Sequence, residues 1–318
     1  MLYGTSGITD IGGASMKNGL CFSVVIPAYN AETFICKALD SVSRQTFNNY
    51  EIVVIDDGST DNTANNIIKW SHEHPGVNLH FVKQENRGVA CARNAGIKKS
   101  IGNYVAFLDA DDIWMPNKLK NVQIFLDQHP SADLVCHDEW AETKDKINPY
   151  RINSGPYVKY RDFLFKRNCL LTSATVVKRD NLLNAGGFSE DMKLVDGAED
   201  YDLWMRLLKN GCRIKYLHEI LSIYRIHGNG LTSKTEKYYN AGLHVLNSHF
   251  HEWRPKTFYY FCVMKLRRAT MLRGAAKILI KSGKTSNGYK YLIKSLIENP
   301  FSWKAWAYFF GALKIINK

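Results

Sequence analysis

The chain has 318 residues, of which 45% are hydrophobic and 12% aromatic, so it can bury a full α/β core and still supply a second element. Its seven cysteines are scattered and never form a C-x-x-C pair, which excludes a zinc site or disulfide framework and is typical of reduced thiols in a cytoplasmic protein. The net charge is +12, and neither an apolar run of 18 residues nor a secretion signal is present.

Residues 1–20 are rich in Gly, Ser and Thr without periodicity, and we expect a flexible tail there. After them, short β-branched or aromatic runs alternate with helix-length segments. This alternation predicts an α/β fold with a mainly parallel sheet flanked by helices. The expected strands are 23–26, 51–55, 79–82, 104–108 and 133–136, and Ile35, Leu39 and Val42 predict the first crossover helix.

Polar side chains follow four of these strands. In an open parallel sheet the ligand crevice lies beyond the carboxyl ends of the strands, so we expect the four groups to line one cleft. The alternative is that Asp and Asn serve only as turn formers, which explains one group better than four in succession. The groups are Asn30, then Asp56, Asp57 and Ser59, then Asn86, then Asp109, Asp111 and Asp112.

Asp109 and Asp111 stand one residue apart directly after the apolar run 104–108. In a reaction that releases a diphosphate, the growing negative charge of this leaving group must be neutralised. A divalent cation held by a few carboxylates can neutralise it. The pair therefore indicates a Mn or Mg site, with helix capping as the alternative. A carboxylate of the run 56–61 could accept hydrogen bonds from uracil and ribose, although this run also suits a turn before a helix.

The second part of the sequence is less regular. The segment 199–209 has helical spacing, 213–217 and 220–224 have the character of strands, and the chain from about 241 is helical and basic. Residues 241–318 contain fourteen Lys and Arg against two acidic residues, so they carry the whole net charge. We therefore divide the chain into a tail (1–20), a catalytic domain (21–235) and a basic helical region (236–318).

Five motifs in this order resemble the inverting family 2 glycosyltransferases of GT-A fold. The likeness covers about residues 20–230 and implies transfer of a sugar from a nucleotide diphosphate, UDP above all, to an acceptor hydroxyl. The motifs are 24–30 (VVIPAYN), 56–61 (DDGSTD), 86–96 (NRGVACARNAG), 109–112 (DADD) and 199–204 (EDYDLW).

The resemblance also implies roles for individual residues. The nucleotide sugar is expected to contact Pro27, Ala28, Tyr29, Asn30, Glu32, Asp57, Asn86, Arg93, Asp109 and Ala110, and the metal to be held by Asp111, Asp109 and His227. Asp200 matches the catalytic base, with Glu199 beside it. Inversion needs one carboxylate that takes the acceptor proton, and a helix start stabilises such a charge. The alternatives are a simple helix-start charge for Asp200 and a structural imidazole for His227.

The basic region interleaves aromatic residues with its cations, for example Tyr259 to Phe261 before Lys265, and Trp303 to Phe309 before Lys314. Such helices can lie in a membrane interface, so we expect a peripheral protein at the inner face of the membrane. A helical hairpin that only packs on the catalytic domain is the alternative.

Three other classes of protein fit these features less well. A dinucleotide-dependent oxidoreductase should carry a G-x-G-x-x-G motif after its first strand, and this sequence has none there. A nucleic-acid-binding module would leave the aspartates unexplained. A sugar nucleotidyltransferase is the nearest rival. We expect a nucleotide-sugar donor, a saccharide or lipid-linked acceptor and no nucleic acid, while the sequence does not indicate the sugar or the oligomeric state.

Overall fold

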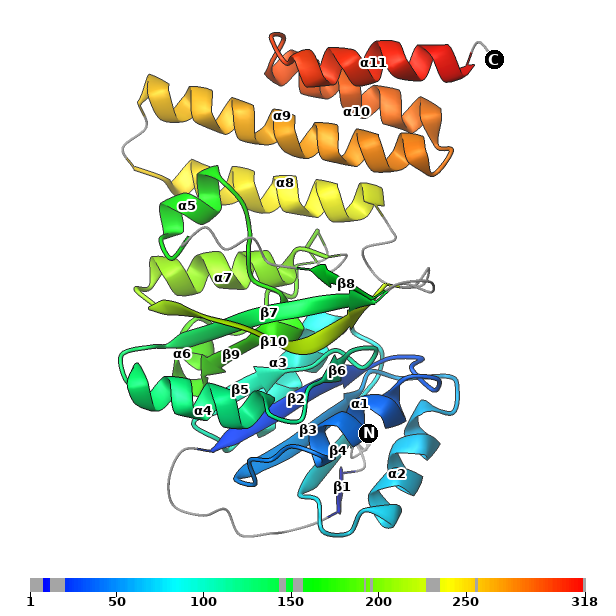
Figure 1. The fold of residues 1–318 in the computed structure, drawn as a ribbon, viewed down its shortest axis with the longest axis vertical. Helices are drawn as coiled ribbons and strands as arrows, with labels where there is room; N and C mark the ends of the chain where they lie inside the picture. The colour runs from blue at the N-terminus through cyan, green and yellow to red at the C-terminus, as the bar shows by residue number, and fades with distance from the viewer. Residues whose placement is uncertain are drawn as a thin grey trace, which may run out of the picture. The chain divides into compact units, whose positions relative to one another are not determined.

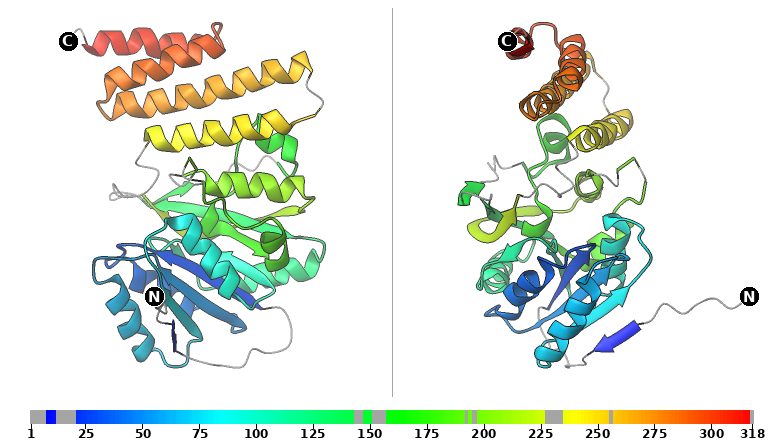
Figure 2. Two further views of the ribbon diagram at one scale, coloured as in Figure 1. Left: turned by 180° about the vertical axis from the view of Figure 1, so that it is seen from behind. Right: turned by 90° about the vertical axis from the view of Figure 1, so that its right-hand side faces the viewer.

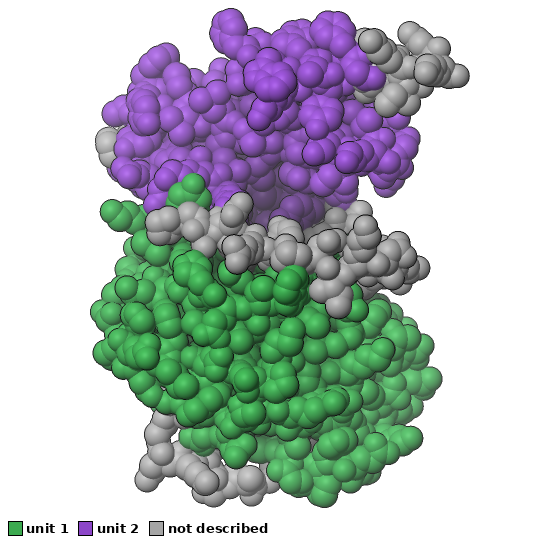
Figure 3. All heavy atoms as spheres, viewed as in Figure 1, with its two compact units in different colours: residues 1–159, 169–190, 202–227 green, residues 160–168, 191–201, 228–318 purple. Residues whose placement is uncertain are grey.

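The computed structural model describes residues 8–11, 21–142, 147–150, 157–191, 193–194, 197–226, 235–254 and 257–316 (Figure 1). These residues fall into two compact units, coloured separately in Figure 3. The first unit comprises 1–159, 169–190 and 202–227, and the second comprises 160–168, 191–201 and 228–318.

The first unit contains one ten-stranded sheet in the order β1-β4-β3-β2-β5-β9-β7-β10-β6, with β8 paired to β7. From β4 to β5 all neighbours are parallel, as predicted, and beyond β5 the sheet becomes mixed because β9 runs antiparallel to both β5 and β7. The strands are β1 (Ile8–Ile11), β2 (Phe22–Ala28), β3 (Tyr50–Asp56), β4 (Leu79–Lys83), β5 (Tyr104–Phe107), β6 (Ile113–Trp114), β7 (Leu134–Glu142), β8 (Ile147–Tyr150), β9 (Thr175–Lys178) and β10 (Ile214–Arg225).

Helices cover both faces of the sheet (Figures 1 and 2). Alternate residues of β2 explain this, since Val24 packs in the cluster under α1 whereas Val25 meets Gly96 of α3. Ile35, Leu39 and Val42 are fully buried in α1, so the predicted crossover helix is confirmed. The helices are α1 (Ile35–Ser43), α2 (Thr63–Glu73), α3 (Val89–Lys99), α4 (Lys118–Gln128), α6 (Arg179–Asn184), α7 (Glu199–Lys209) and the 3-10 turn η1 (Thr172–Ala174).

Two segments differ from expectation. The two strands predicted at 213–217 and 220–224 are one strand, β10, whose parallel register with β7 shifts between Leu217 and Ser222. This bulge interrupts the alternation of side chains, which made one strand resemble two. Within the segment predicted as a tail, residues 8–11 form β1, which pairs antiparallel with β4.

The second unit is helical. Leu272, Ala276 and Leu279 of α9 pack against Leu292 of α10 in a small apolar core. Figure 2 shows α8 to α11 stacked side by side in chain order. Within the described chain, no helix is long and apolar enough to cross a bilayer. The helices are α5 (Tyr160–Phe165), α8 (Thr235–Glu252), α9 (Phe258–Lys281), α10 (Thr285–Glu298) and α11 (Trp303–Ile316), and the unit also includes the first three residues of α7.

Candidate active site

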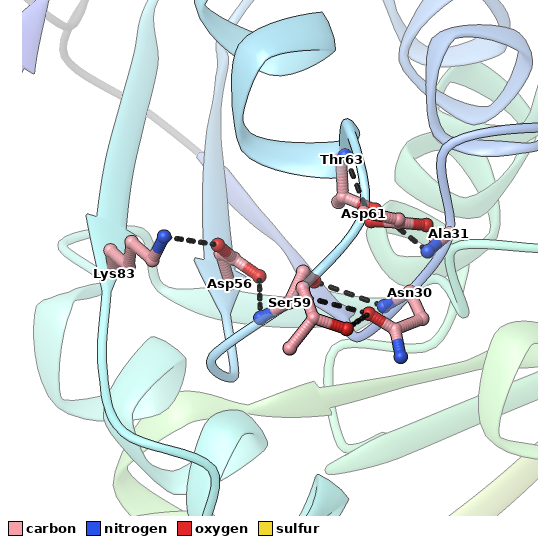
Figure 4. A network of polar contacts seen from close by, with 8 residues as sticks. Asn30, Ala31, Asp56, Ser59, Asp61, Thr63 and Lys83 are labelled. Carbon is pink, nitrogen blue, oxygen red and sulfur yellow. Dashed lines mark hydrogen bonds and ion pairs between the residues drawn. The ribbon is translucent and has the colours of Figure 1, made fainter.

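The loops that follow β2 and β3 are joined by hydrogen bonds (Figure 4). The backbone N–H of Asn30 donates to Ser59 Oγ at 2.9 Å, and Asn30 Oδ1 accepts from the N–H of Thr60 at 2.9 Å. Asn30 has a φ of 48°, the one positive value outside glycine in the described chain, which Asn tolerates better than most residues. The polar run after β2 is therefore fixed to the run after β3, as expected for one edge of a parallel sheet.

The remaining predicted residues of the β2 motif lie in or beside this junction. Pro27 and Ala28 end β2, and Tyr29 is 52% exposed. Pro27 lies past the last β2–β5 pair, so its missing N–H interrupts no ladder with β5. Glu32 Oε2 accepts from the N–H of Asn62 at 3.0 Å, so this predicted contact of the nucleotide sugar also orders the start of α2.

Asp57 is buried and holds the loop that follows β4. Its Oδ1 accepts from Gln84 Nε2 at 2.7 Å and from the N–H of Arg87 at 3.0 Å, and its Oδ2 accepts from the N–H of Gly88 at 2.8 Å. A carboxylate offers about four acceptor positions, so one remains for a further donor. The neighbouring Gly58 has a φ of +75°, and a Cβ there would lie 2.7 Å from the backbone nitrogen of Asn86. Only glycine fits this approach.

Arg93 of α3 and Asp109 after β5 form a close ion pair. Arg93 Nη2 lies 2.7 Å from Asp109 Oδ1, and the arginine side chain is 4% exposed whereas the carboxylate is 31% exposed. The guanidinium carbon also lies 5.2 Å from the centroid of the Phe188 ring. A buried cation therefore faces Asp109, one of the two carboxylates of the D-x-D motif (Asp109 and Asp111) that was predicted to hold the metal.

The D-x-D segment forms a tight turn at the end of β5. The N–H of Asp109 donates to Ser173 Oγ at 3.0 Å, and the N–H of Asp112 donates to the carbonyl of Asp109 at 3.0 Å. Ala110 is buried in the sheet core and Asp111 is half-buried. Asp112 is fully buried and accepts from the N–H of Arg225 at 3.0 Å. Burial, with the charges of Asp111 and Glu139, raises the pKa of Asp112 well above its usual range.

Asp109 and Asp111 are partly exposed, whereas Asp112 is fully buried. Two carboxylates fit a divalent cation only where phosphate oxygens and water supply most of the ligands, as in nucleotide sites. Among the described residues, no three His, Cys, Asp or Glu side chains gather to hold a metal alone. The donor set thus suits a cation that is bound together with a diphosphate. His227, the third predicted ligand, lies outside the described residues.

Sequence reasoning missed a buried charged group beneath this turn. Lys118 of α4 is fully buried, its Nζ donates to the carbonyl of Ser173 at 2.6 Å, and it lies 3.5 Å from the Trp114 ring centroid. Ser173 is also the residue whose hydroxyl holds Asp109. Burial lowers the pKa of Lys118 well below its usual range, and the carboxylate of Glu139 opposes this. The available signal was that residues 118, 119, 122 and 126 share one helix face.

Glu139 of β7 is a second fully buried titratable group whose charge acts on Lys118. Burial raises its pKa to about 7, against the hydrogen bond from Ser222 and the charge of Lys118. Ser222 Oγ donates to Glu139 Oε1 at 2.6 Å. Two neighbouring strands of the sheet, β7 and β10, are thereby linked by side chains as well as by their ladder.

Asp200 and Glu199, the proposed base and its neighbour, lie in the first turn of α7, and the predicted helix 199–209 is confirmed. Glu199 is buried and Asp200 is half-buried. Both residues belong to the second unit, whereas Asp57, Arg93, Asp109 and Asp111 belong to the first. The convergence of Asp200 with these four residues stays a prediction.

The sequence has clear relatives. The family described as Glycosyl transferase family 2 matches residues 23–178. The UDP-Glc:alpha-D-GlcNAc-diphosphoundecaprenol beta-1,3-glucosyltransferase WfgD of Escherichia coli is 31% identical over 216 residues, which are 68% of this chain and 81% of that protein. An uncharacterized glycosyltransferase of Rickettsia bellii is 30% identical over 71% of this chain, and the match spans only 32% of that longer protein.

Solved structures share the fold at low identity. Residues 1–349 of S. aureus TarS, in complex with UDP-GlcNAc, superpose with a TM-score of 0.64 at 19% identity over 92% of both chains. The mannosyltransferase PcManGT of Pyrobaculum calidifontis, in complex with GDP-Man and Mn2+, gives a TM-score of 0.59 at 20% identity over 89% of this chain and 87% of that one. The predicted fold class is therefore confirmed. The family match and the WfgD similarity show that this chain belongs to the family 2 glycosyltransferases.

Proposed function

We propose that this glycosyltransferase moves a hexose from a nucleoside diphosphate, most favourably UDP, to an acceptor hydroxyl with inversion at the anomeric carbon. The observation that carries the proposal is the arrangement at one sheet edge. Asp57 follows β3, Asp109 and Asp111 follow β5, and β2 lies between these strands with all three parallel. Ligands of an open α/β sheet bind beyond such carboxyl ends.

The nucleoside end of the donor would lie against the loops after β2 and β3. Tyr29 offers an exposed ring for stacking, and Asp57 retains acceptor capacity for the N3–H of uracil. Pro27, Ala28, Asn30 and Glu32 would shape this part of the site. Asn86 and Arg93 would contact the nucleotide or its phosphates.

A Mn or Mg ion would be held by Asp111 and Asp109, and when bound it would supply positive charge to the departing diphosphate. Arg93 would add a second positive charge beside Asp109 without leaving its ion pair. Asp200, with Glu199 beside it, would accept the proton of the acceptor hydroxyl as the new glycosidic bond forms and the bond to the diphosphate breaks.

The acceptor is proposed to be a saccharide on a lipid carrier. WfgD, by its name, transfers glucose to a sugar linked to diphosphoundecaprenol, and an acceptor of that class would bring the enzyme to a bilayer. We further propose that the protein works in bacterial surface-polysaccharide or glycolipid synthesis, in the cytoplasm, peripherally at the inner face of the membrane through residues 236–318.

The test is a screen of nucleotide sugars for turnover by the full chain with and without Mn2+. We expect release of a nucleoside diphosphate from one UDP-sugar, with loss in Asp111→Asn and in Asp200→Asn but not in Asp127→Asn on the exposed side of α4. Asp200→Asn should retain UDP binding, because a base does not hold the nucleotide. Formation of UTP and a sugar 1-phosphate when pyrophosphate is added to the nucleotide sugar would instead identify a sugar nucleotidyltransferase, and no turnover with no UDP binding would refute the proposal.

A further inference from the structure

The outermost helix of the second unit, α11, has a largely exposed apolar face. Ala305 is buried, and Phe309 lies on the side toward α10, where the ring centroids of Tyr289 and Phe309 are 5.3 Å apart. The opposite side presents Trp303, Trp306, Ala307 and Phe310, spaced i, i+3, i+4 and i+7 so that they share one face. We call these four residues the α11 face.

The α11 face is unusual for a surface exposed to water. Trp303 is 73% exposed, Phe310 is 58% exposed, and Trp306 stacks on Phe310 with ring centroids 5.7 Å apart. Grouped aromatic side chains of this kind mark an interaction site, whereas single exposed apolar residues do not. Trp is favoured where one side of a ring meets hydrocarbon and its polar edge meets water.

Apart from Glu298, the charged residues of α10 and α11 are all lysines. Lys290 and Lys294 alternate with Ile293 and Ile297 along the exposed side of α10, and Ile297 is 72% exposed. Lys304 lies next to Trp303 on α11 itself.

No acidic residue follows Glu298 in the sequence, and the carboxylate of Glu298 is paired with Arg268 at 2.9 Å. A second copy of this chain would bring lysines against lysines, so the charge favours an anionic partner over self-association.

The dimensions favour a position in the plane of a membrane. The 14 residues of α11 extend about 21 Å, less than the roughly 30 Å of a bilayer core. A short helix with aromatic side chains on one face and lysines at its flank suits the boundary between headgroups and acyl chains.

We propose that the α11 face inserts into the surface of an anionic lipid bilayer, with Lys290, Lys294 and Lys304 at the headgroups. This inference deepens the membrane contact in the proposed function, but it does not depend on the transfer chemistry. It also restricts the proposed membrane contact to fewer residues than the sequence suggested. Tyr260, expected from the sequence to face the membrane, instead stacks on Phe165 with centroids 5.1 Å apart and contacts Trp253, within the second unit.

The test compares sedimentation of the full chain with vesicles of phosphatidylcholine alone and of phosphatidylcholine with roughly a quarter phosphatidylglycerol. We expect binding to the anionic vesicles only. Trp303→Glu combined with Phe310→Glu should weaken it at least about tenfold, because a charge would enter the apolar boundary. The matched control is Ile101→Glu, another apolar residue, 67% exposed in the first unit, which should bind like the wild type.

The lysines are tested separately. Replacing Lys290, Lys294 and Lys304 by Gln should weaken binding roughly 100-fold, since each cation near an anionic surface is worth about fivefold. UDP binding without vesicles should be unchanged in every variant, which separates failure of this inference from failure of the proposed function. Equal binding by Trp303→Glu/Phe310→Glu and wild type would overturn the proposal. The proposal would also be overturned if the wild type did not bind the vesicles but formed an oligomer, and if the Trp303→Glu/Phe310→Glu variant were monomeric.

Discussion

The Nη2 atom of Arg93 lies 2.7 Å from Oδ1 of Asp109, and this contact joins α3 to the D-x-D turn after β5. The contact leaves the second oxygen of Asp109 for other ligands. In the proposed function it would also keep a fixed cation beside the departing diphosphate, where negative charge accumulates. Arg93 is thus both a structural and a candidate binding residue.

Replacing Arg93 by Met should destabilise the fold by about 2–4 kcal/mol, because it leaves Asp109 without its buried partner. The control is Arg44→Met, which removes an exposed pair with Asp40 and should cost less than about 1 kcal/mol. Urea denaturation of the two variants measures the difference. Equal losses would show that the Arg93 pair does not hold the turn.

Asp57→Asn should weaken both the fold and nucleotide binding. Asp57 accepts hydrogen bonds from two backbone N–H groups of the loop after β4. In the Asn variant, the side-chain NH2 group would face one of these N–H groups, so that two donors would meet. An unsatisfied buried donor costs about 1–3 kcal/mol. Stability is measured by denaturation and nucleotide affinity by UDP titration, and Asp57→Asn is compared with Asp127→Asn as the exposed control. A variant with wild-type stability would contradict the assigned loop contacts.

The buried pair of Lys118 and Glu139 should behave as a coupled unit. Lys118→Met removes both the charge that favours ionisation of Glu139 and the donor to the carbonyl of Ser173, and should cost about 3–5 kcal/mol. Adding Glu139→Gln should recover part of this loss, because the uncompensated charge is then gone. The double-mutant cycle is measured by chemical denaturation. Strictly additive losses would mean that the two charges do not interact.

Asp133 should make stability depend on acid pH. Burial raises its pKa, but hydrogen bonds from Arg213 and Lys178 outweigh this and lower the pKa to about 2. The folded-state pKa is thus below the unfolded value near 3.9. The resulting stabilisation is full above about pH 4 and lost as pH falls toward 2. Thermal unfolding from pH 5 to 2 should show Asp133→Asn less stable at pH 5, with the difference shrinking toward pH 2. A constant difference would refute this assignment.

Local patterns predicted the elements that depend on local periodicity. Ile35, Leu39 and Val42 fall on one face of α1 because a helix repeats every 3.6 residues, and that face is buried. The helix 199–209 was predicted with the bounds it has. The bulge in β10 was not predicted, because its register depends on pairing with β7.

The residues of the candidate site were predicted from the sequence, but the contacts between them were not. The resemblance supplied Arg93 and Asp109, yet their ion pair requires α3 to pack beside the end of β5. Asp112 was grouped with its acidic neighbours, although its partner is the backbone N–H of Arg225, 113 residues away. Lys118 was missed because lysine is almost never fully buried, and only the tertiary structure supplies Ser173 as its acceptor.

In the proposed function, Asp111 holds a divalent cation jointly with the diphosphate of a nucleotide. Calorimetric titration of UDP into wild type, Asp111→Asn and Asp127→Asn, each with Mn2+ or with EDTA, tests it most directly. We expect wild type and Asp127→Asn to bind UDP at least about tenfold more tightly with Mn2+, and Asp111→Asn to lose that gain. Binding that is independent of Mn2+, or an undiminished gain in Asp111→Asn, would contradict the claim.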